Sequence, residues 1–262
     1  MTSLGRTNRN LLDKLDLDAP HVTEVRRLLQ NVYRMRTGHD TDIRSFLITS
    51  ASREEGKSTI SSLMAIVSAR IFYKRTLLID ADLRRPAVHP LLGVSQSPGL
   101  FEAMKRKVSL QDAIHPTPLP MLSVVPSGHM RGVVSEAYSD EDFRRILTQA
   151  TAAYDLVFVD APPAVPVIEP QLMAAHTDAI LVVVMAGQTA LTMVRRFMQI
   201  MAPVQGKLAG VILNNATEGL PYYYDHRYYG YPKNQPSRIR TVHEEPREDM
   251  GEQARDIAGG KS

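Results

Sequence analysis

The stretch "FLITSASREEGKST", residues 46–59, decides the fold. An apolar run, a loop containing Gly56 and then Lys-Ser-Thr form the pattern of a strand, a turn and the start of a helix. Backbone N–H groups and the helix dipole at such a turn favour a bound phosphate. Lys57 would reach the phosphates, and Ser58 would bind Mg²⁺. Ala51 stands where the usual pattern begins with glycine, so a plain strand–turn–helix with a solvated lysine is the alternative.

Short apolar runs alternate with helical stretches along the rest of the chain. Most runs are apolar at every position, as expected for strands that are buried on both faces of a covered, largely parallel sheet. The predicted strands are 44–49, 76–80, 121–125, 155–160, 179–184 and 209–213, and the predicted helices are 21–36, 58–73, 139–153 and 190–202. This order predicts an α/β fold, doubly wound, with a mainly parallel sheet flanked by helices.

Acidic residues end two of these predicted strands. In "TLLIDADLRRPAVH", residues 76–89, Asp80 and Asp82 are two positions apart, so a strand would direct both carboxylates the same way. Buried acids need a metal or a cation as partner, although a pair of loop-capping aspartates is the alternative. In "YDLVFVDAPP", residues 154–163, Asp160 follows an apolar strand and would orient Mg²⁺. The three aspartates and the phosphate loop are expected to meet at the carboxyl edge of the sheet. This arrangement predicts nucleotide hydrolysis or phosphoryl transfer.

The composition excludes several classes of protein. The 262 residues carry a formal net charge of +3, which gives no strong tendency to bind nucleic acid. There is no cysteine, and therefore no disulfide framework or cysteine-ligated metal site. The N-terminus lacks the apolar region of a signal peptide. The longest apolar run, residues 179–187, is far shorter than the roughly 20 residues of a membrane span, so we expect a cytoplasmic protein that reaches a membrane through a partner.

The C-terminal part of the chain has a different character. Six of the ten tyrosines lie between residues 222 and 231, and the segment after them is charged and poor in apolar residues. Such a segment cannot bury enough apolar surface to offset the entropy of ordering, so we predict disorder. The predicted organisation is a flexible arm over 1–20, a P-loop domain over 21–216, a tyrosine cluster over 217–232 and a disordered tail over 233–262.

Four segments together resemble the bacterial tyrosine kinases of capsule and exopolysaccharide synthesis, which are related to the MinD/ParA-type P-loop ATPases. They are "IDADLRRPAVH" at 79–89, "YDLVFVDAPP", "GVILNN" at 210–215 and the tyrosine cluster. The resemblance covers roughly residues 22–231 and implies a MinD-like P-loop fold, with ATP and Mg²⁺ as cofactors. It also implies an ATP-dependent protein-tyrosine autokinase that regulates polysaccharide polymerisation and export.

The resemblance assigns a role to each candidate site residue. The residues expected to take part in catalysis are Lys57, Asp80, Asp82 and Asp160, with Asp80 as the acceptor of the tyrosine proton. Those expected to bind the nucleotide are Glu55, Gly56, Lys57, Ser58, Thr59, Arg84 and Asn214, and those expected to hold Mg²⁺ are Ser58, Asp82 and Asp160. The expected phosphoacceptors are Tyr222, Tyr223, Tyr224, Tyr228, Tyr229 and Tyr231, modified by a neighbouring subunit. A contact tail or a surface for single-stranded nucleic acid are the alternatives for this cluster.

The resemblance also implies partners. These are a separate membrane chain-length protein as activator, further copies of the chain in a homo-oligomer, and a tyrosine phosphatase, with recruitment to the inner face of the plasma membrane. Two positions depart from the family: Glu54 replaces a glycine of the phosphate loop, and Gln30 replaces the last arginine of an E-x-x-R-x-x-R helix linked to ring assembly. A regulatory ATPase of the same fold, without phosphotransfer, is the alternative function. A MinD-like positioning ATPase is a further one, which the missing early lysine of the loop disfavours.

Overall fold

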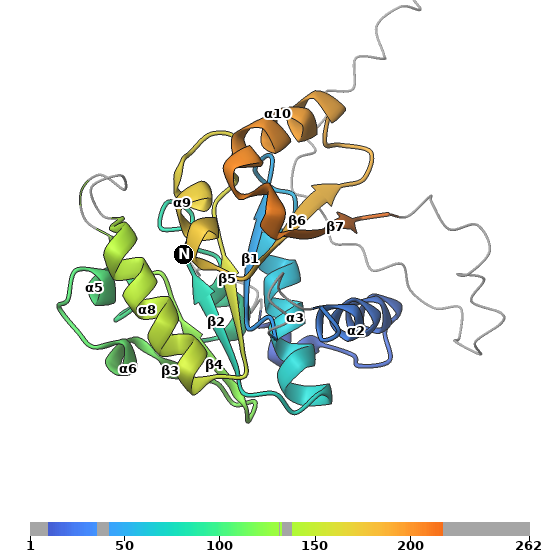
Figure 1. Cartoon of the computed structure of the whole chain (residues 1–262). Helices are drawn as coiled ribbons and strands as arrows, with labels where there is room; N and C mark the ends of the chain where they lie inside the picture. The colour runs from blue at the N-terminus through green and yellow to red at the C-terminus, as the bar shows by residue number, and fades with distance from the viewer. Residues whose placement is uncertain (1–9, 36–41, 131, 133–137, 217–262) are drawn as a thin grey trace, which may run out of the picture. The chain divides into compact units, whose positions relative to one another are not determined.

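A computed structural model of the chain describes residues 10–35, 42–130, 132 and 138–216. A seven-stranded sheet in the order β3-β4-β2-β5-β1-β6-β7 forms its centre (Figure 1). All neighbouring strands are parallel except β3, which pairs antiparallel with β4. The strands are β1 Ser45–Ser50, β2 Thr76–Asp80, β3 His115–Pro116, β4 Leu122–Val125, β5 Leu156–Asp160, β6 Ala179–Met185 and β7 Leu208–Asn214.

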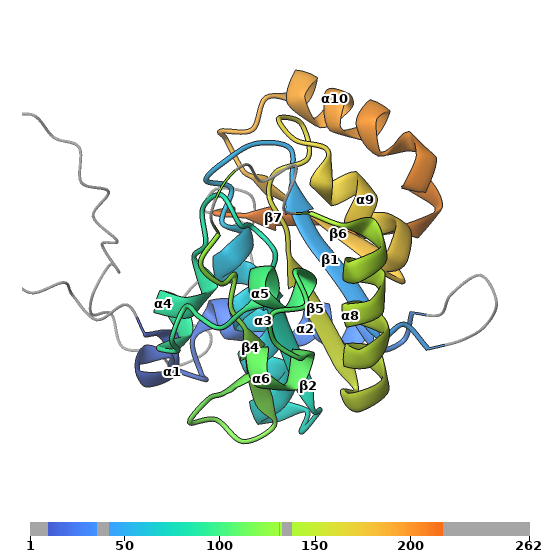
Figure 2. The ribbon, with the colours of Figure 1, turned by 90° about the vertical axis from the view of Figure 1, so that its left-hand side faces the viewer.

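Helices cover both faces of this sheet (Figures 1 and 2). Their bounds are α1 Leu11–Lys14, α2 Pro20–Val32, α3 Lys57–Ile71, α4 Val88–Leu92, α5 Leu100–Met104, α6 Leu110–Ala113, α8 Asp140–Ala153, α9 Glu169–His176 and α10 Leu191–Met201, followed by the 3₁₀ helix η1 Ala202–Lys207. None of the helices in the described ranges is long and apolar enough to cross a membrane.

The strand side chains divide the core into two layers. Phe46 and Ile48 of β1 pack in one cluster with α2, α3 and α4, whereas Leu47 between them packs in the other with α5, α8, α9 and α10. Successive residues of a strand point to opposite faces, and every residue of β1, β2 and β5 is buried. Both observations confirm the predicted doubly wound α/β fold.

The structure adds elements that the sequence patterns did not predict. Helix α9 has a proline at its second position and no long helical repeat of apolar residues, so its sequence gave no clear signal. A flexible arm was predicted over residues 1–20. Within the described part of this segment, residues 10–20 contain the helix α1, which lies beside α4 (Figure 2). The side chains of Leu11, Leu12, Leu15 and Leu17 pack against the core layer of α2 and α3. These leucines anchor a segment that is otherwise largely polar.

The carboxyl ends of five parallel strands meet at one edge of the sheet. The phosphate loop follows β1, Asp80 and Asp160 end β2 and β5, a tight turn follows β6, and Asn214 ends β7. In open α/β sheets this edge is the usual place for a ligand. The candidate site is therefore assembled from segments that lie far apart in the sequence.

Candidate functional site

Residues 51–56 form the predicted phosphate loop between β1 and α3. Gly56 precedes the first helical residue and has a φ of +86°, a conformation that favours glycine. A Cβ atom at this position would lie 2.1 Å from the side-chain nitrogen of Asn214, so an alanine would force the Asn214 amide to move. Lys57 begins α3 and is only 7% exposed. The loop thus places a buried ammonium group at a helix N-terminus, where the dipole favours anions.

Glu54 occupies the loop position where the resemblance predicts a glycine. Its φ is +63°, in the left-handed region that residues with a Cβ rarely adopt. The substitution therefore keeps the backbone conformation of a glycine, at a cost on the order of 1–2 kcal/mol.

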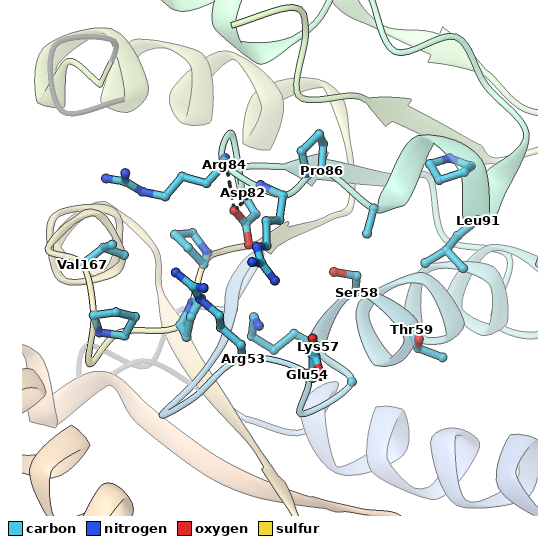
Figure 3. A pocket seen from close by; sticks show the side chains of 17 residues that line it. Arg53, Glu54, Lys57, Ser58, Thr59, Asp82, Arg84, Pro86, Leu91 and Val167 are labelled. Carbon is cyan, nitrogen blue, oxygen red and sulfur yellow. Dashed lines mark hydrogen bonds between the residues drawn. The ribbon is translucent and has the colours of Figure 1, made fainter. Parts of the chain in front are cut away.

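A cavity of about 450 Å³ opens beside the loop (Figure 3). Its lining combines cations, hydroxyls and two carboxylates with several prolines: Arg53, Glu54, Gly56, Lys57, Ser58, Thr59, Asp82, Arg84, Arg85, Pro86, Ala87, Pro90, Leu91, Pro162, Pro163, Pro166 and Val167. Cationic and hydroxyl groups around a helix N-terminus suit a phosphate-bearing ligand.

Asp80 and Asp160 lie opposite each other in the register of β2 and β5, and both are completely buried. Among the described residues, neither carboxylate oxygen of Asp160 has a hydrogen-bond partner. Burial raises the pKa of Asp160 to about 7, although nearby Ser58 and Lys57 favour the charged form. The hydroxyl of Ser58 lies close to this carboxylate without forming a hydrogen bond of good geometry.

The carboxylate of Asp80 is occupied by backbone donors. Oδ1 accepts from the N–H of Asp82 at 3.2 Å, and Oδ2 accepts from Ala87 and Val88, each at 3.1 Å. Burial, followed by the charge of Asp160, raises the pKa of Asp80 well above its ordinary value. Asp80 therefore shapes the loop after β2 and makes a stronger base than an exposed carboxylate.

Asp82 is the residue of the two acid segments whose carboxylate faces the cavity. It is 9% exposed, and its Oδ1 accepts from the backbone N–H groups of Arg84 at 3.2 Å and Arg85 at 3.0 Å (Figure 3). These bonds fix its direction, while its second oxygen has no such bond to the 84–85 backbone. The predicted metal ligands are thus close together: Asp82 and Ser58 line the cavity, and Asp160 lies near both of them.

The donor set fits Mg²⁺ bound together with a phosphate ligand. The described part of the chain has no cluster of three or more His, Cys, Asp or Glu side chains that would hold a metal by itself. Mg²⁺ usually takes one or two protein carboxylates and completes its octahedron with waters and substrate phosphates. The unpartnered, buried carboxylate of Asp160 is the group that such an ion would neutralise.

The remaining predicted nucleotide-binding residues have different environments. Thr59 lines the cavity, whereas the guanidinium of Arg84 extends away from Lys57 and forms an ion pair with Glu169 at 2.6 Å (Figure 3). Asn214 donates its side-chain N–H to the backbone oxygen of Glu55 at 3.0 Å. The structure thus brings the loop, the two acid segments and Asn214 together. The six predicted phosphoacceptor tyrosines lie outside the described residues.

Sequence reasoning missed three residues at this site. Glu169 is 3% exposed and pairs with Arg84, and Thr189 donates its hydroxyl to the side chain of Glu55. Arg53 lines the cavity next to the loop. No motif marked Glu169 or Thr189, because each meets its partner across a long stretch of chain.

The geometry defines a P-loop nucleotide-binding domain, and comparisons with known proteins narrow this class. The model of a family described as an AAA domain matches residues 54–214. Tyrosine-protein kinase YwqD of Bacillus subtilis is 30% identical over 230 residues, which are 88% of this chain and 95% of that protein. The succinoglycan biosynthesis transport protein ExoP of Rhizobium meliloti is 31% identical over 209 residues, 78% of this chain but 26% of ExoP.

A solved structure agrees with these relatives. The kinase domain of the Escherichia coli tyrosine kinase ETK superposes with a TM-score of 0.70 at 27% sequence identity, covering 86% of this chain and 89% of that one. The chain therefore belongs to the bacterial tyrosine-protein kinase family, within the P-loop ATPases, and is a tyrosine kinase.

Proposed function

We propose that this chain is an ATP-dependent autokinase that phosphorylates its own C-terminal tyrosine cluster and thereby regulates the polymerisation and export of an exopolysaccharide or capsule. The kinase domain lies within residues 21–216, and the acceptor tyrosines lie within 217–232. Support for the polysaccharide role comes from the similarity to a protein named for succinoglycan biosynthesis and transport.

The observation that carries the proposal is the arrangement around the loop. A buried lysine at a helix N-terminus, a cavity lined by cations and two completely buried carboxylates meet at one edge of the sheet. Phosphoryl transfer depends mainly on positioning and on neutralisation of charge, and this arrangement offers both.

Each residue then has a role. Lys57 and the backbone N–H groups of the loop hold the β- and γ-phosphates, with Thr59 beside them. Ser58, Asp82 and Asp160 hold Mg²⁺, which when bound would neutralise phosphate charge. Arg84 and Asn214 complete the nucleotide site, and the backbone of Glu55 and Gly56 shapes the loop.

The reaction is a transfer to a phenol. The phenolic oxygen forms a bond to the γ-phosphorus of ATP, the bond to the β,γ-bridging oxygen breaks, and ADP leaves. The phenol has an ordinary pKa near 10, so an acceptor for its proton aids the attack. We assign this role to Asp80, because its raised pKa makes it a stronger base than an exposed carboxylate.

The tyrosines reach a neighbouring subunit in this proposal. A tail tethered to an oligomer is present at high effective concentration near the other active sites. A separate membrane chain-length protein activates the kinase and recruits it to the inner face of the plasma membrane. A tyrosine phosphatase reverses the modification.

Phosphosite mapping tests the proposal. The protein is isolated from its own cells, where any activator is present, and wild type is compared with Lys57→Met by mass spectrometry. We expect phosphate on tyrosines 222–231 in the wild type and none in the variant, because the variant lacks the ammonium group that holds the phosphates. An unmodified cluster in cells that are making polymer would contradict autophosphorylation and leave an ATP-driven assembly switch.

A further inference from the structure

A tight turn follows β6 and lies against the end of β7. The N–H groups of Gln188 and Thr189 both donate to the carbonyl of Met185, at 3.2 and 3.0 Å. The N–H of Ala186 donates to the carbonyl of Asn214 at 2.8 Å, which ties the turn to the last strand. The position of Thr189 is therefore determined by backbone contacts with β6 and β7.

The hydroxyl of Thr189 is both an acceptor and a donor, and these two contacts orient its proton. Its oxygen accepts the N–H of Met185 at 3.0 Å. A hydroxyl has one proton, and Thr189 donates it in a hydrogen bond to Oε1 of Glu55. The turn after β6 thus delivers one oriented donor to the phosphate loop.

Glu55 needs such a donor. Its side chain is 3% exposed, and its other oxygen, Oε2, accepts the backbone N–H of Ser52 at 2.8 Å. The carboxylate lies in a loop that must receive phosphate anions, but Glu55 is absent from the residues that line the cavity. A carboxylate turned toward bound phosphate would repel it, so holding the group away from the cavity favours binding.

The side chain and the backbone carbonyl of Glu55 are each hydrogen-bonded by a residue next to β6 or at the end of β7. Thr189 holds the side chain from the turn after β6, and Asn214 donates to the backbone oxygen from the end of β7. A Cβ atom at the adjacent Gly56 would meet the Asn214 amide, so this amide lies close to the backbone of the loop. The turn after β6 and the end of β7 therefore both support the loop.

We propose that Thr189 is a positioning residue for nucleotide binding, which acts by holding the Glu55 carboxylate out of the phosphate site. The inference rests on the proposed binding of nucleotide at this loop. Thr189 does not touch the ligand, and its effect is transmitted through one hydrogen bond to Glu55.

Isosteric substitutions of the full-length chain test the proposal. Thr189→Val removes the hydroxyl and keeps the shape, Thr189→Ser keeps the hydroxyl, and Thr192→Val is the matched control on the exposed first turn of α10. The dissociation constant of ADP with Mg²⁺ is measured by calorimetry, and amide hydrogen exchange of residues 52–57 is measured without nucleotide. We expect about tenfold weaker ADP binding and faster exchange in Thr189→Val, but changes within about twofold in the other two variants.

A double-substitution cycle tests the route through Glu55. In a Glu55→Ala background, Thr189→Val should alter ADP binding by less than about twofold, because the group it positions is gone. Binding and exchange in Thr189→Val equal to those of the wild type would overturn the proposal, as would equal losses in the valine and serine variants. If the wild type binds no ADP, the proposed function fails instead, and hydrogen exchange in the nucleotide-free chain still decides the role of Thr189.

Discussion

At the scale of single residues, Asp160 combines complete burial with the lack of a hydrogen-bond partner among the described residues. A buried charge without a partner destabilises the folded state, so the group retains its proton up to a pKa of about 7. Such a residue lowers the stability of the folded protein when no ligand is bound, and a bound cation would remove this cost by neutralising the carboxylate. We read the destabilisation as the physical sign of a ligand site.

The pH dependence of stability follows from this pKa. The unfolded pKa of aspartate is about 3.9, and the folded value is raised, so Asp160 lowers the stability progressively as the pH rises between about 4 and 7. We expect Asp160→Asn to nearly match the wild type in melting temperature near pH 4, where Asp160 is protonated in the folded state and about half so in the unfolded state, and to exceed it at pH 8, without nucleotide or Mg²⁺. Differential scanning calorimetry at both pH values checks this.

Asp155 provides the opposite control. The hydrogen bond from Arg75 lowers the pKa of Asp155, so its charge stabilises the folded state above the unfolded pKa, and this contribution is lost only as the pH falls. Asp155→Asn should therefore lower the melting temperature at pH 8. An Asp160→Asn variant that is no more stable than the wild type at pH 8 would contradict the assigned environment of Asp160.

At the scale of elements, helix α9 connects the site to the 3₁₀ helix η1. Glu169 in its first turn pairs with Arg84 beside the cavity. At its other end, Nζ of Lys207 donates to the carbonyls of Ala174, Ala175 and Thr177, at 3.2, 2.5 and 2.8 Å. A cation that satisfies the last carbonyls also interacts favourably with the helix dipole.

Removal of this cap should loosen α9. We expect Lys207→Met to lower stability by about 1 kcal/mol, equivalent to a melting temperature lower by about 2–4 °C for a domain of this size. Thermal unfolding followed by circular dichroism gives the value. Arg195→Met, at an exposed position of α10, is the control and should leave the melting temperature within 1 °C or so. Equal melting temperatures of the two variants would show that the cap contributes nothing measurable.

At the scale of the whole molecule, the proposed autophosphorylation of the tyrosine cluster would connect the chemistry to assembly. Each phosphate adds about −1.5 to −2 charges near neutral pH, so six would add roughly −9 to −12 to a chain with a formal charge of +3. In the proposed oligomer, the negative charges on phosphorylated tails of neighbouring subunits would repel one another. Autophosphorylation would therefore release tails from active sites and loosen the oligomer.

Exchange of the six cluster tyrosines for phenylalanine tests this mechanism. The wild-type oligomer, with its activator, should dissociate after addition of ATP and Mg²⁺, whereas the phenylalanine variant should stay assembled, because it gains no charge. Light scattering during the reaction provides the measurement. Dissociation of the variant at the wild-type rate would show that nucleotide binding, and not tail charge, drives disassembly.

Much of the fold could be predicted because the signals are local. Apolar runs such as 76–80 and 155–160 specify strands buried on both faces, and their alternation with helices specifies the doubly wound sheet. The short α9 and the anchored segment around α1 were not predictable, since neither has a long periodic pattern and each is stabilised by packing against distant residues.

The sequence by itself determined the class of fold, the phosphate loop and the carboxylates that end β2 and β5, because each depends on residues next to one another in the chain. Only the tertiary structure decided that Asp160 is left without a hydrogen-bond partner among the described residues, that Arg84 is engaged by Glu169, and that Thr189 holds Glu55. Thr189 and Glu55 are separated by 134 positions, and a hydrogen bond needs atoms within about 3 Å. Such a contact exists only once the sheet has brought the ends of β1 and β6 side by side.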